Sequence, residues 1–314
     1  MKVAITGATG FIGSYLVKRH ADAGDEVRVL TRKTANDLNF NKHVVTFQGS
    51  LSDKSTIKEF VNGVDVLYHC AAEIKDEAKM QEINVTGTAN LIEAAAGNIK
   101  HWVQLSSVGV YGPIHEGVVT EENKPAPNNT YEKTKFISDQ SVLEAAREGK
   151  FTLTILRPSN VFGADMRNGS LFALIKSIDK GIFFFIGPKG ASANYISVEN
   201  VVEALVLCAT NKAAIGKIYN ISDWTTMEDF VKVIADVLKK PFPKFRLPLT
   251  FARLIGKIGD RVSKVPLTSG RVNALTTTSI YSNDAIVNDL NYHNIVPTKT
   301  AIQNFVIAYK NRQV

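Results

Sequence analysis

Short, continuously apolar runs alternate with segments of helical periodicity through the first half of the chain. The runs do not alternate apolar with polar residues, which is typical of strands that a parallel sheet buries on both faces. The predicted strands are 2–6, 26–30, 44–47, 64–69, 102–105 and 153–156. The predicted helices between them are 11–23, 54–61, 78–97 and 130–148. This alternation predicts an α/β fold with a doubly wound parallel sheet, which would bind its ligand at the carboxyl ends of the strands.

The pattern loosens after Arg157. Helices are predicted near 170–179, 198–210, 226–238 and 298–311, and short strands near 183–186 and 217–221. We therefore expect a dinucleotide-binding domain over 1–165 and a smaller C-terminal lobe, mostly 166–314, that shapes a substrate pocket. Whether some elements of the lobe return to the main sheet is left open.

A glycine-rich turn follows the first predicted strand at once. Gly7, Gly10 and Gly13 have the spacing G-x-x-G-x-x-G. Glycine permits a positive φ in a tight turn and lets backbone N–H groups approach a diphosphate, and the N-terminus of a helix adds partial positive charge. Because this turn joins a buried strand to an amphipathic helix, it predicts a dinucleotide site rather than an ordinary connection.

The end of the second predicted strand indicates which dinucleotide is bound. A carboxylate usually stands there, about 20 residues past the glycine turn, and holds the adenosine ribose hydroxyls. Thr31 takes that place, and Arg32 and Lys33 follow it. Without the carboxylate nothing repels a 2′-phosphate, and Arg32 can bind one with two hydrogen bonds. We therefore expect NADP to be preferred; the alternative is NAD, with Arg32 and Lys33 as solvent-facing charges.

Tyr131 and Lys135 form a candidate catalytic pair, because residues four apart on a helix share one face. Ser107 follows the predicted strand 102–105, at the edge where such a sheet presents its ligand cleft. Hydride transfer between a carbon and a nicotinamide must be matched by proton transfer at the oxygen. A phenol with a pKa of about 10 is a poor base at neutral pH. A nearby ammonium together with the positive nicotinamide favours the phenolate, so we expect Lys135 and the bound cofactor to lower the pKa of Tyr131, and Ser107 to orient the reacting oxygen.

Composition excludes several classes of function. The chain has 37 lysines and arginines against 30 aspartates and glutamates, but no nucleic-acid motif accompanies the charge, so nucleic acid is not an expected partner. The chain contains no run of about 18 apolar residues, so no membrane span is predicted. The six histidines have no metal-ligand spacing, and no metal is expected. Cys70 and Cys208 lie in apolar surroundings, which predicts buried thiols and a reducing, cytoplasmic compartment.

Two features of the C-terminal half have more than one interpretation. The run 182–186 is either a buried strand or a wall of the substrate pocket. Basic residues gather in two loose clusters, which indicate a solvated face, an anionic ligand or a membrane surface. The clusters are Lys239, Lys240 and Lys244, and Arg253, Lys257, Arg261 and Lys264.

Six sequence blocks occur in a characteristic order. They are TGATGFIG at 6–13, HCAA at 69–72, NVTGTANL at 84–91, SSVGVYG at 106–112, YEKTK at 131–135 and LRPSNVFG at 156–163. In this order they resemble the extended branch of the short-chain dehydrogenase/reductase superfamily. The resemblance implies a Rossmann fold, a catalytic triad of Ser107, Tyr131 and Lys135, and a supporting role for Asn84. The cofactor residues that it implies, besides Tyr131 and Lys135, are Gly7, Gly10, Phe11, Ile12, Gly13, Leu51, Ala71, Ala72, Pro158 and Val161.

The resemblance narrows the substrate only in part. Many members of the branch act on nucleotide-linked sugars, and the dehydratases among them carry an acidic pair where this chain has Val108 and Gly109. Elimination of water needs that extra acid and base. The leading hypothesis is therefore an NAD(P)-dependent epimerase or 4-ketoreductase of a nucleoside-diphosphate sugar, with Asn160 and Arg167 as candidate substrate contacts.

Two other hypotheses stay open. Ala193 and Asn194 stand where sugar-nucleotide members often carry an arginine, although Arg167, Lys189 or Arg271 can replace that cation. The run 194–205 resembles the hydroxysteroid-dehydrogenase side of the branch, which favours a hydroxysteroid-like or other apolar alcohol or ketone. A non-catalytic dinucleotide sensor is the third hypothesis, and the intact triad argues against it. Family analogy also implies a homodimer that pairs the helices near 78–97 and 130–148.

Overall fold

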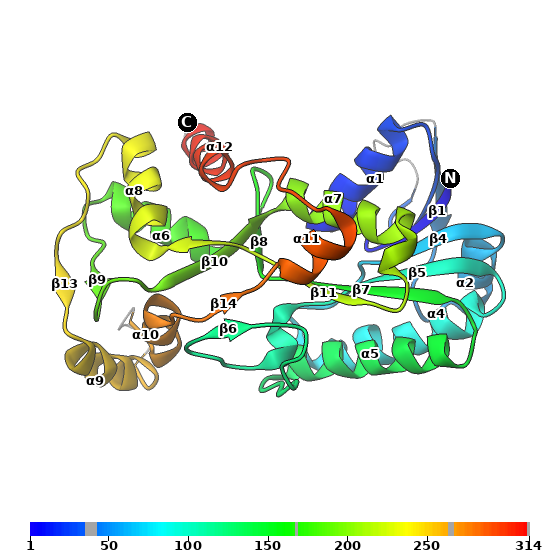
Figure 1. Cartoon of the computed structure of the whole chain (residues 1–314), viewed down its shortest axis with the longest axis horizontal. Helices are drawn as coiled ribbons and strands as arrows, with labels where there is room; N and C mark the ends of the chain where they lie inside the picture. Colours follow the sequence, from blue (N-terminus) through cyan, green and yellow to red (C-terminus); the bar gives the residue numbers. More distant parts are fainter. Residues whose placement is uncertain (35–42, 167–168, 263–266, 313–314) are drawn as a thin grey trace.

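The described residues, 1–34, 43–166, 169–262 and 267–312, come from a computed structural model. A seven-stranded parallel sheet lies at their centre, in the order β11-β7-β5-β4-β1-β2-β3 (Figure 1). Its strands are β1 (Lys2–Thr6), β2 (Glu26–Thr31), β3 (Val44–Gln48), β4 (Val64–His69), β5 (Ile99–Leu105), β7 (Thr152–Pro158) and β11 (Ile218–Ile221). The predicted doubly wound Rossmann fold is therefore confirmed.

Helices cover both faces of this sheet (Figure 1). On one face lie α1 (Phe11–Asp22), α7 (Val198–Thr210) and α11 (Asp284–Leu290). On the other lie α2 (Lys54–Val61), α4 (Gly87–Ala95) and α5 (Thr130–Arg147). The single helix predicted over 78–97 is instead α3 (Glu77–Met80), a π-helix η2 (Gln81–Thr86) and α4. A π-turn inside a helical run is often found at a functional site.

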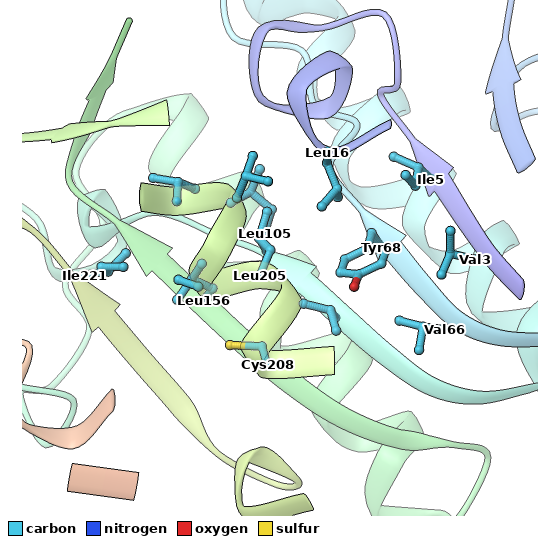
Figure 2. Packing of buried hydrophobic residues seen from close by; sticks show 14 of the residues in the cluster. Val3, Ile5, Leu16, Val66, Tyr68, Leu105, Leu156, Leu205, Cys208 and Ile221 are labelled. Carbon is cyan, nitrogen blue, oxygen red and sulfur yellow. The ribbon is translucent and has the colours of Figure 1, made fainter. Parts of the chain in front are cut away.

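The face under α1 and α7 forms the largest apolar core. Its side chains are fully or almost fully buried, as expected for a parallel sheet with helices on both faces. Figure 2 labels Val3, Ile5, Leu16, Val66, Tyr68, Leu105, Leu156, Leu205, Cys208 and Ile221. Cys208 is buried as predicted, whereas Cys70 is only partly buried, and both are free thiols.

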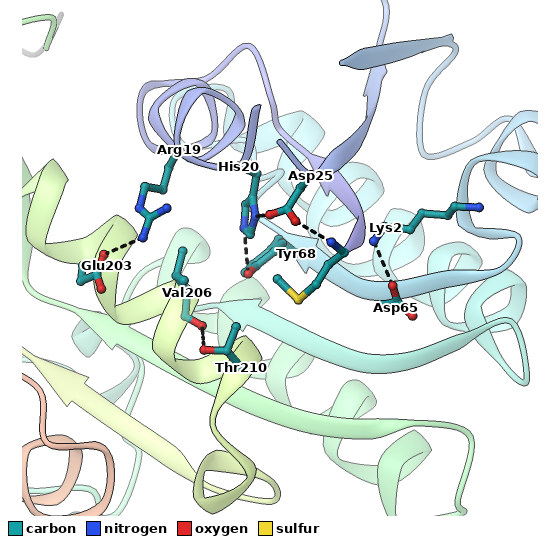
Figure 3. Close-up of polar contacts among 10 residues, drawn as sticks. Lys2, Arg19, His20, Asp25, Asp65, Tyr68, Glu203, Val206 and Thr210 are labelled. Carbon is teal, nitrogen blue, oxygen red and sulfur yellow. Dashed lines mark hydrogen bonds and ion pairs between the residues drawn. The ribbon is translucent and has the colours of Figure 1, made fainter. Parts of the chain in front are cut away.

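A polar cluster fastens α1 to the sheet beside that core (Figure 3). His20 joins Asp25 through Nδ1 at 2.7 Å and the Tyr68 hydroxyl through Nε2 at 3.0 Å. Burial lowers the pKa of His20 although the neighbouring Asp25 opposes the change. Arg19 reaches Glu203 on α7 at 3.6 Å, so the two helices on this face are also tied to each other.

A smaller lobe is built mainly from the C-terminal half (Figure 1). Its helices are α6 (Gly169–Asp179), α8 (Met227–Leu238), α9 (Leu249–Gly259), α10 (Ser269–Thr276) and α12 (Thr298–Asn311). A three-stranded sheet joins β8 (Asn160–Phe162), β10 (Ser192–Ser197) and β12 (Asp223–Thr226). Two short pairs complete it, β9 (Phe185–Ile186) with β13 (Arg246–Leu247), and β14 (Ile280–Tyr281) with β6 (Val118–Val119).

The chain crosses between the lobe and the main sheet more than once. After β10 it forms α7 on the sheet face and then β11, which pairs with β7 at the sheet edge. The strand predicted at 183–186 is limited to β9, while Phe183 and Phe184 are partly exposed and Ile182 is 65% exposed. Among the described helices we find none whose length and apolar character would suit a membrane span.

Candidate active site

The glycine turn has the geometry that a bound diphosphate requires. Gly7 has φ +68°, and a Cβ on it would lie 2.7 Å from the backbone N of Ala71. A Cβ on Gly13 would lie 2.2 Å from the carbonyl oxygen of Gly7, so the third glycine lets α1 start directly against the turn. Gly10 caps α1 without a side-chain hydrogen bond, and no acid stands in the first turn of the helix. The positive end of α1 is therefore suited to an anion such as a pyrophosphate.

Most of the other predicted cofactor residues lie along the carboxyl ends of the strands. Ala71 and Ala72 follow β4, and the Ala71 N–H donates to Thr6 Oγ1 at the end of β1 over 3.2 Å. Pro158 ends β7 and Val161 lies on β8. Leu51 is buried in the loop after β3.

The remaining cofactor residues belong to α1 and to the end of β2. Phe11 and Ile12 begin α1 and are partly buried against the core. Arg32 is exposed. Asp76 raises the pKa of Lys79 on α3, and the nearby charge of Arg32 opposes that rise. Arg32 therefore lies within electrostatic reach of Lys79, which is itself paired with Asp76 at 3.0 Å.

The structure brings Tyr131, Lys135 and Ser107 together. A capping box between Asn129 and Glu132 starts α5, which places Tyr131 in the first turn and Lys135 in the second. Lys135 is 3% exposed, and its Nζ donates to the carbonyl oxygen of Leu105 at the end of β5 over 2.8 Å. Ser107 lies close enough to Tyr131 to oppose the rise in the pKa of that phenol, and its Oγ accepts from the backbone N–H of Gly109 at 3.1 Å.

The predicted substrate contacts are only partly placed. Asn160 lies exposed on β8, and its side-chain amide donates to the carbonyl oxygen of Asn194 on β10. Arg167 lies outside the described residues. Ala193 and Asn194 stand where sugar-nucleotide members of the branch often carry an arginine. Both are buried, and the Asn194 amide donates to the carbonyl oxygen of Ser279. In the described residues, no group of three histidines, cysteines or carboxylates has the geometry of a metal site.

Comparison with known proteins identifies the family. The sequence profile of the NAD dependent epimerase/dehydratase family matches residues 3–222. The chain belongs to this family. Its match covers every sequence block from the glycine turn to the LRPSNVFG block, so the predicted membership of the extended short-chain dehydrogenase/reductases is confirmed. The family supports an NAD-dependent enzyme of the short-chain dehydrogenase/reductase type.

Similar proteins in the NAD-dependent epimerase/dehydratase family differ in the substrates that their names give. UDP-glucose 4-epimerase of Vibrio cholerae is 24% identical over 274 residues, which are 82% of this chain and 81% of that protein. The 3 beta-hydroxysteroid dehydrogenase/Delta 5-->4-isomerase of Mycobacterium tuberculosis is 28% identical over 271 residues, 78% of this chain and 72% of that one. UDP-glucuronic acid 4-epimerase from Bacillus cereus, in complex with NAD, has a TM-score of 0.78 at 20% identity over all of both chains, which shows a shared fold.

The electrostatics of Tyr131 differ from the sequence prediction. Burial raises the pKa of Tyr131 to about 12, and the Asp139 carboxylate adds to the rise, while the hydrogen bond from Ser107 opposes it. Lys135 is not among the groups that shift the pKa of Tyr131, and the loss of hydration of the phenolate sets the direction of the change. The family's cofactor supplies a positive nicotinamide ring when it is bound in its oxidised form, and a positive charge there favours the phenolate.

A chain of hydrogen bonds joins the ends of β1 and β4 to α5, the helix that carries Tyr131 and Lys135. His69 at the end of β4 joins Thr6 Oγ1 through Nδ1 at 2.7 Å and Thr88 Oγ1 through Nε2 at 2.9 Å. Thr88 meets Ser138 of α5 at 2.8 Å. Burial, with a contribution from the Lys135 charge, lowers the pKa of His69 to about 3. His69 is therefore a neutral bridge between the strands and α5 rather than a base.

We expect His69 to make the fold acid-sensitive. The unfolded chain takes up a proton on this histidine below a pH of about 6.5, whereas the folded chain does so only near the lowered pKa of about 3. As the pH falls from about 6.5 to about 3, the protonation of His69 in the unfolded chain should lower the free energy of unfolding by up to about 1.4 kcal/mol per pH unit. Urea unfolding between pH 7.5 and 5 should show a smaller pH slope in His69→Gln than in wild type. His115→Gln, at an exposed histidine, is the control; equal slopes in all three proteins would contradict the prediction.

Asn84 lies on the π-helix η2 and is 1% exposed. Its Oδ1 accepts from the backbone N–H of Glu73 at 2.7 Å, and its Nδ2 donates to the Glu73 carbonyl and to Thr134 Oγ1. This side chain holds the loop after β4 against α5, next to Tyr131 and Lys135. Asn84 is the one buried residue of η2, in the middle of a helical run.

Sequence reasoning missed a buried ionic network next to Lys135. Asp139, one turn further along α5, is fully buried, accepts from Ser106 Oγ at 2.6 Å and pairs with Arg157 of β7 at 3.3 Å. Arg157 also donates to the Tyr111 hydroxyl at 3.0 Å. The Asp139 charge opposes the lowering of the pKa of Lys135 that burial causes. The only sequence signal for it was the position of an acid four residues after Lys135, on the same helix face.

Proposed function

We propose that this protein is an NAD(P)-dependent epimerase or 4-ketoreductase of a nucleoside-diphosphate sugar. The observation that carries the proposal is the placement of Ser107 close to the Tyr131 hydroxyl, with Lys135 four residues further along α5 and its Nζ on the Leu105 carbonyl oxygen at 2.8 Å. These groups lie at the same sheet edge as the glycine turn, so a substrate hydroxyl beside the nicotinamide can meet both side chains. The UDP-sugar epimerase names among its relatives agree with this substrate class.

In this proposal the chain's own residues handle the proton. A nicotinamide cofactor, held by the turn at Gly7, Gly10 and Gly13, would supply the hydride acceptor and donor for this chemistry. Ser107 orients the sugar oxygen, and Tyr131 takes its proton as phenolate in the oxidation and gives a proton back in the reduction. Lys135 holds positive charge close to Tyr131 and fixes the end of β5 through Leu105.

The proposal extends to the cofactor and the assembly. Exposed Arg32, with Lys79 nearby and no carboxylate at Thr31, supports a preference for NADP over NAD. Family analogy supports a homodimer through α4, α5 and their neighbours, and a substrate lobe formed mostly by residues 166–314. A copurified nucleotide distinguishes the two reactions, because an epimerase keeps its NAD bound through the cycle and a reductase exchanges NADPH.

A second candidate is a dehydrogenase or reductase of an apolar alcohol. The buried Ala193 and Asn194, which offer no cation to a diphosphate, and the hydroxysteroid dehydrogenase among the relatives favour it. A third is a dinucleotide sensor, which would need the glycine turn but not the triad.

Ligand-dependent melting tests the leading proposal against the second. We expect NADPH to raise the melting temperature, and a millimolar UDP-, GDP-, CDP- or dTDP-sugar to raise it further. If none of these sugar nucleotides changes melting or turnover in the presence of cofactor while a hydroxysteroid does, the second candidate replaces the first. Arg32→Ala should remove any preference for NADPH over NADH and leave NADH binding unchanged.

A further inference from the structure

Helix α9 turns its large apolar side chains outward. Phe251, Leu254, Ile255 and Ile258 follow one another at the spacing of a single helix face and are all exposed, Phe251 by 61% and Leu254 by 60%. Val262, 44% exposed, continues the same face beyond the helix. Isolated exposed apolar residues are ordinary, but a contiguous row of large ones marks an interaction surface. We call these five residues the outward face of α9.

The inward side of α9 explains this orientation. The buried residues of the helix are Ala252, Gly256 and Gly259, all small. A Cβ on Gly256 would lie 3.1 Å from the backbone N of Ser269, so α9 packs closely on the start of α10 through this stripe. A helix of an ordinary globular core buries its large apolar residues and exposes its small ones. The close backbone packing therefore fixes α9 with its apolar face away from the protein.

Positive charge borders the outward face. Arg253, Lys257 and Arg261 are exposed along the flank of α9 beside the outward face, and Asp260 is the one acid between residues 240 and 262. Asp260 already accepts a hydrogen bond from the backbone N–H of Ser269. Just before β13, Phe245 is 65% exposed and Lys244 is exposed, so the combination of apolar and basic side chains continues beyond the helix.

We propose that the outward face of α9 docks on an anionic membrane surface, with α9 in the plane of the interface. Its apolar side chains would enter the boundary between headgroups and acyl chains, and the bordering cations would lie among anionic headgroups. A second copy of the chain is a poorer occupant, because a two-fold contact through this face would bring Arg253, Lys257 and Arg261 close to their own equivalents. Figure 1 shows α9 at the far end of the smaller lobe, clear of the helices on the main sheet. The inference does not depend on the proposed function.

Vesicle sedimentation of the whole chain tests the proposal. We expect the protein to sediment with phosphatidylcholine vesicles that contain phosphatidylglycerol, to bind pure phosphatidylcholine much less, and to be released as salt rises. Phe251→Gln with Leu254→Gln should weaken binding to the anionic vesicles by at least about tenfold, because two large side chains no longer enter the interface. Arg253→Gln with Lys257→Gln should remove most of the preference for anionic lipid.

The matched control is Val287→Gln with Ile307→Gln, which changes two exposed apolar residues on α11 and α12. This variant should bind as wild type does, and circular dichroism should show all variants folded. Wild type that fails to bind anionic vesicles, or a Phe251/Leu254 variant that binds as tightly as wild type, would overturn the proposal. Sedimentation velocity without lipid provides a further test: if the Phe251/Leu254 variant dissociates a wild-type dimer, the face belongs to a second copy and the membrane proposal is wrong.

Discussion

Tyr131→Phe is expected to lower turnover by about 10²–10⁴-fold, the usual contribution of a positioned proton donor or acceptor. The substitution removes only the Tyr131 hydroxyl, which lies close to Ser107. The ring can keep its place in the first turn of α5. Cofactor should still raise the melting temperature of the variant, because the glycine turn and α1 are unchanged. Steady-state turnover and cofactor-dependent melting, measured on the same preparation, separate the two effects.

Tyr219→Phe is the control for this experiment. It also removes one phenol hydroxyl, which hydrogen-bonds Asp289 at 3.0 Å and lies away from the triad, so turnover should be retained. Full turnover in Tyr131→Phe would contradict the proposed chemistry. A complete absence of turnover in wild type, with an unchanged phenotype in the variant, would favour the sensor.

The raised pKa of Tyr131 also predicts how the reaction responds to pH. Alcohol oxidation needs the phenolate, and in the chain without cofactor the pKa of this phenol is about 12. The oxidation rate should therefore rise with pH until the phenol ionises in the cofactor complex. The reduction rate should fall over the same range, because it needs the protonated phenol.

The sequence predicted the main sheet well because each of its strands carries its own signal. The strands of this sheet are largely apolar because helices cover both of its faces, and the glycine turn and the pair of Tyr131 and Lys135 depend on spacings within one segment. The strand pairs of the lobe have no such local signal. Tyr195 pairs with Asn160 and Asn194 with Trp224, contacts that only the folded chain creates.

The electrostatics of the site depend on burial, which spacing does not reveal. Lys135 lies four residues after Tyr131 on α5, but the direction of the change in the pKa of Tyr131 follows from desolvation and from Asp139. Of the second basic cluster, Arg253 and Lys257 lie on α9, which ends at Gly259, Arg261 follows the helix, and Lys264 lies outside the described residues. Nothing in the sequence distinguishes these cations from other surface charges. The outward orientation of Phe251 and Leu254 follows from the packing of α9 on α10.

Arg157→Leu is expected to lower the free energy of unfolding by about 3–5 kcal/mol, the cost of leaving one partner of a buried ion pair without the other. Asp139 is fully buried, so its carboxylate cannot recover hydration when the guanidinium is removed. The Tyr111 hydroxyl would lose a donor at the same time. Urea unfolding at neutral pH measures the effect.

The double variant Asp139→Leu with Arg157→Leu distinguishes an unpaired charge from a packing defect. With both charges gone, apolar side chains replace the pair, and we expect the double variant to be more stable than Arg157→Leu alone. Lys100→Ala breaks an exposed pair with Asp65 and should cost no more than about 1 kcal/mol. If Arg157→Leu costs as little as Lys100→Ala, the buried network does not hold β7 to α5. If it costs the expected amount, the same network fixes the helix that carries Tyr131 and Lys135, so stability and the geometry of the triad depend on one ion pair.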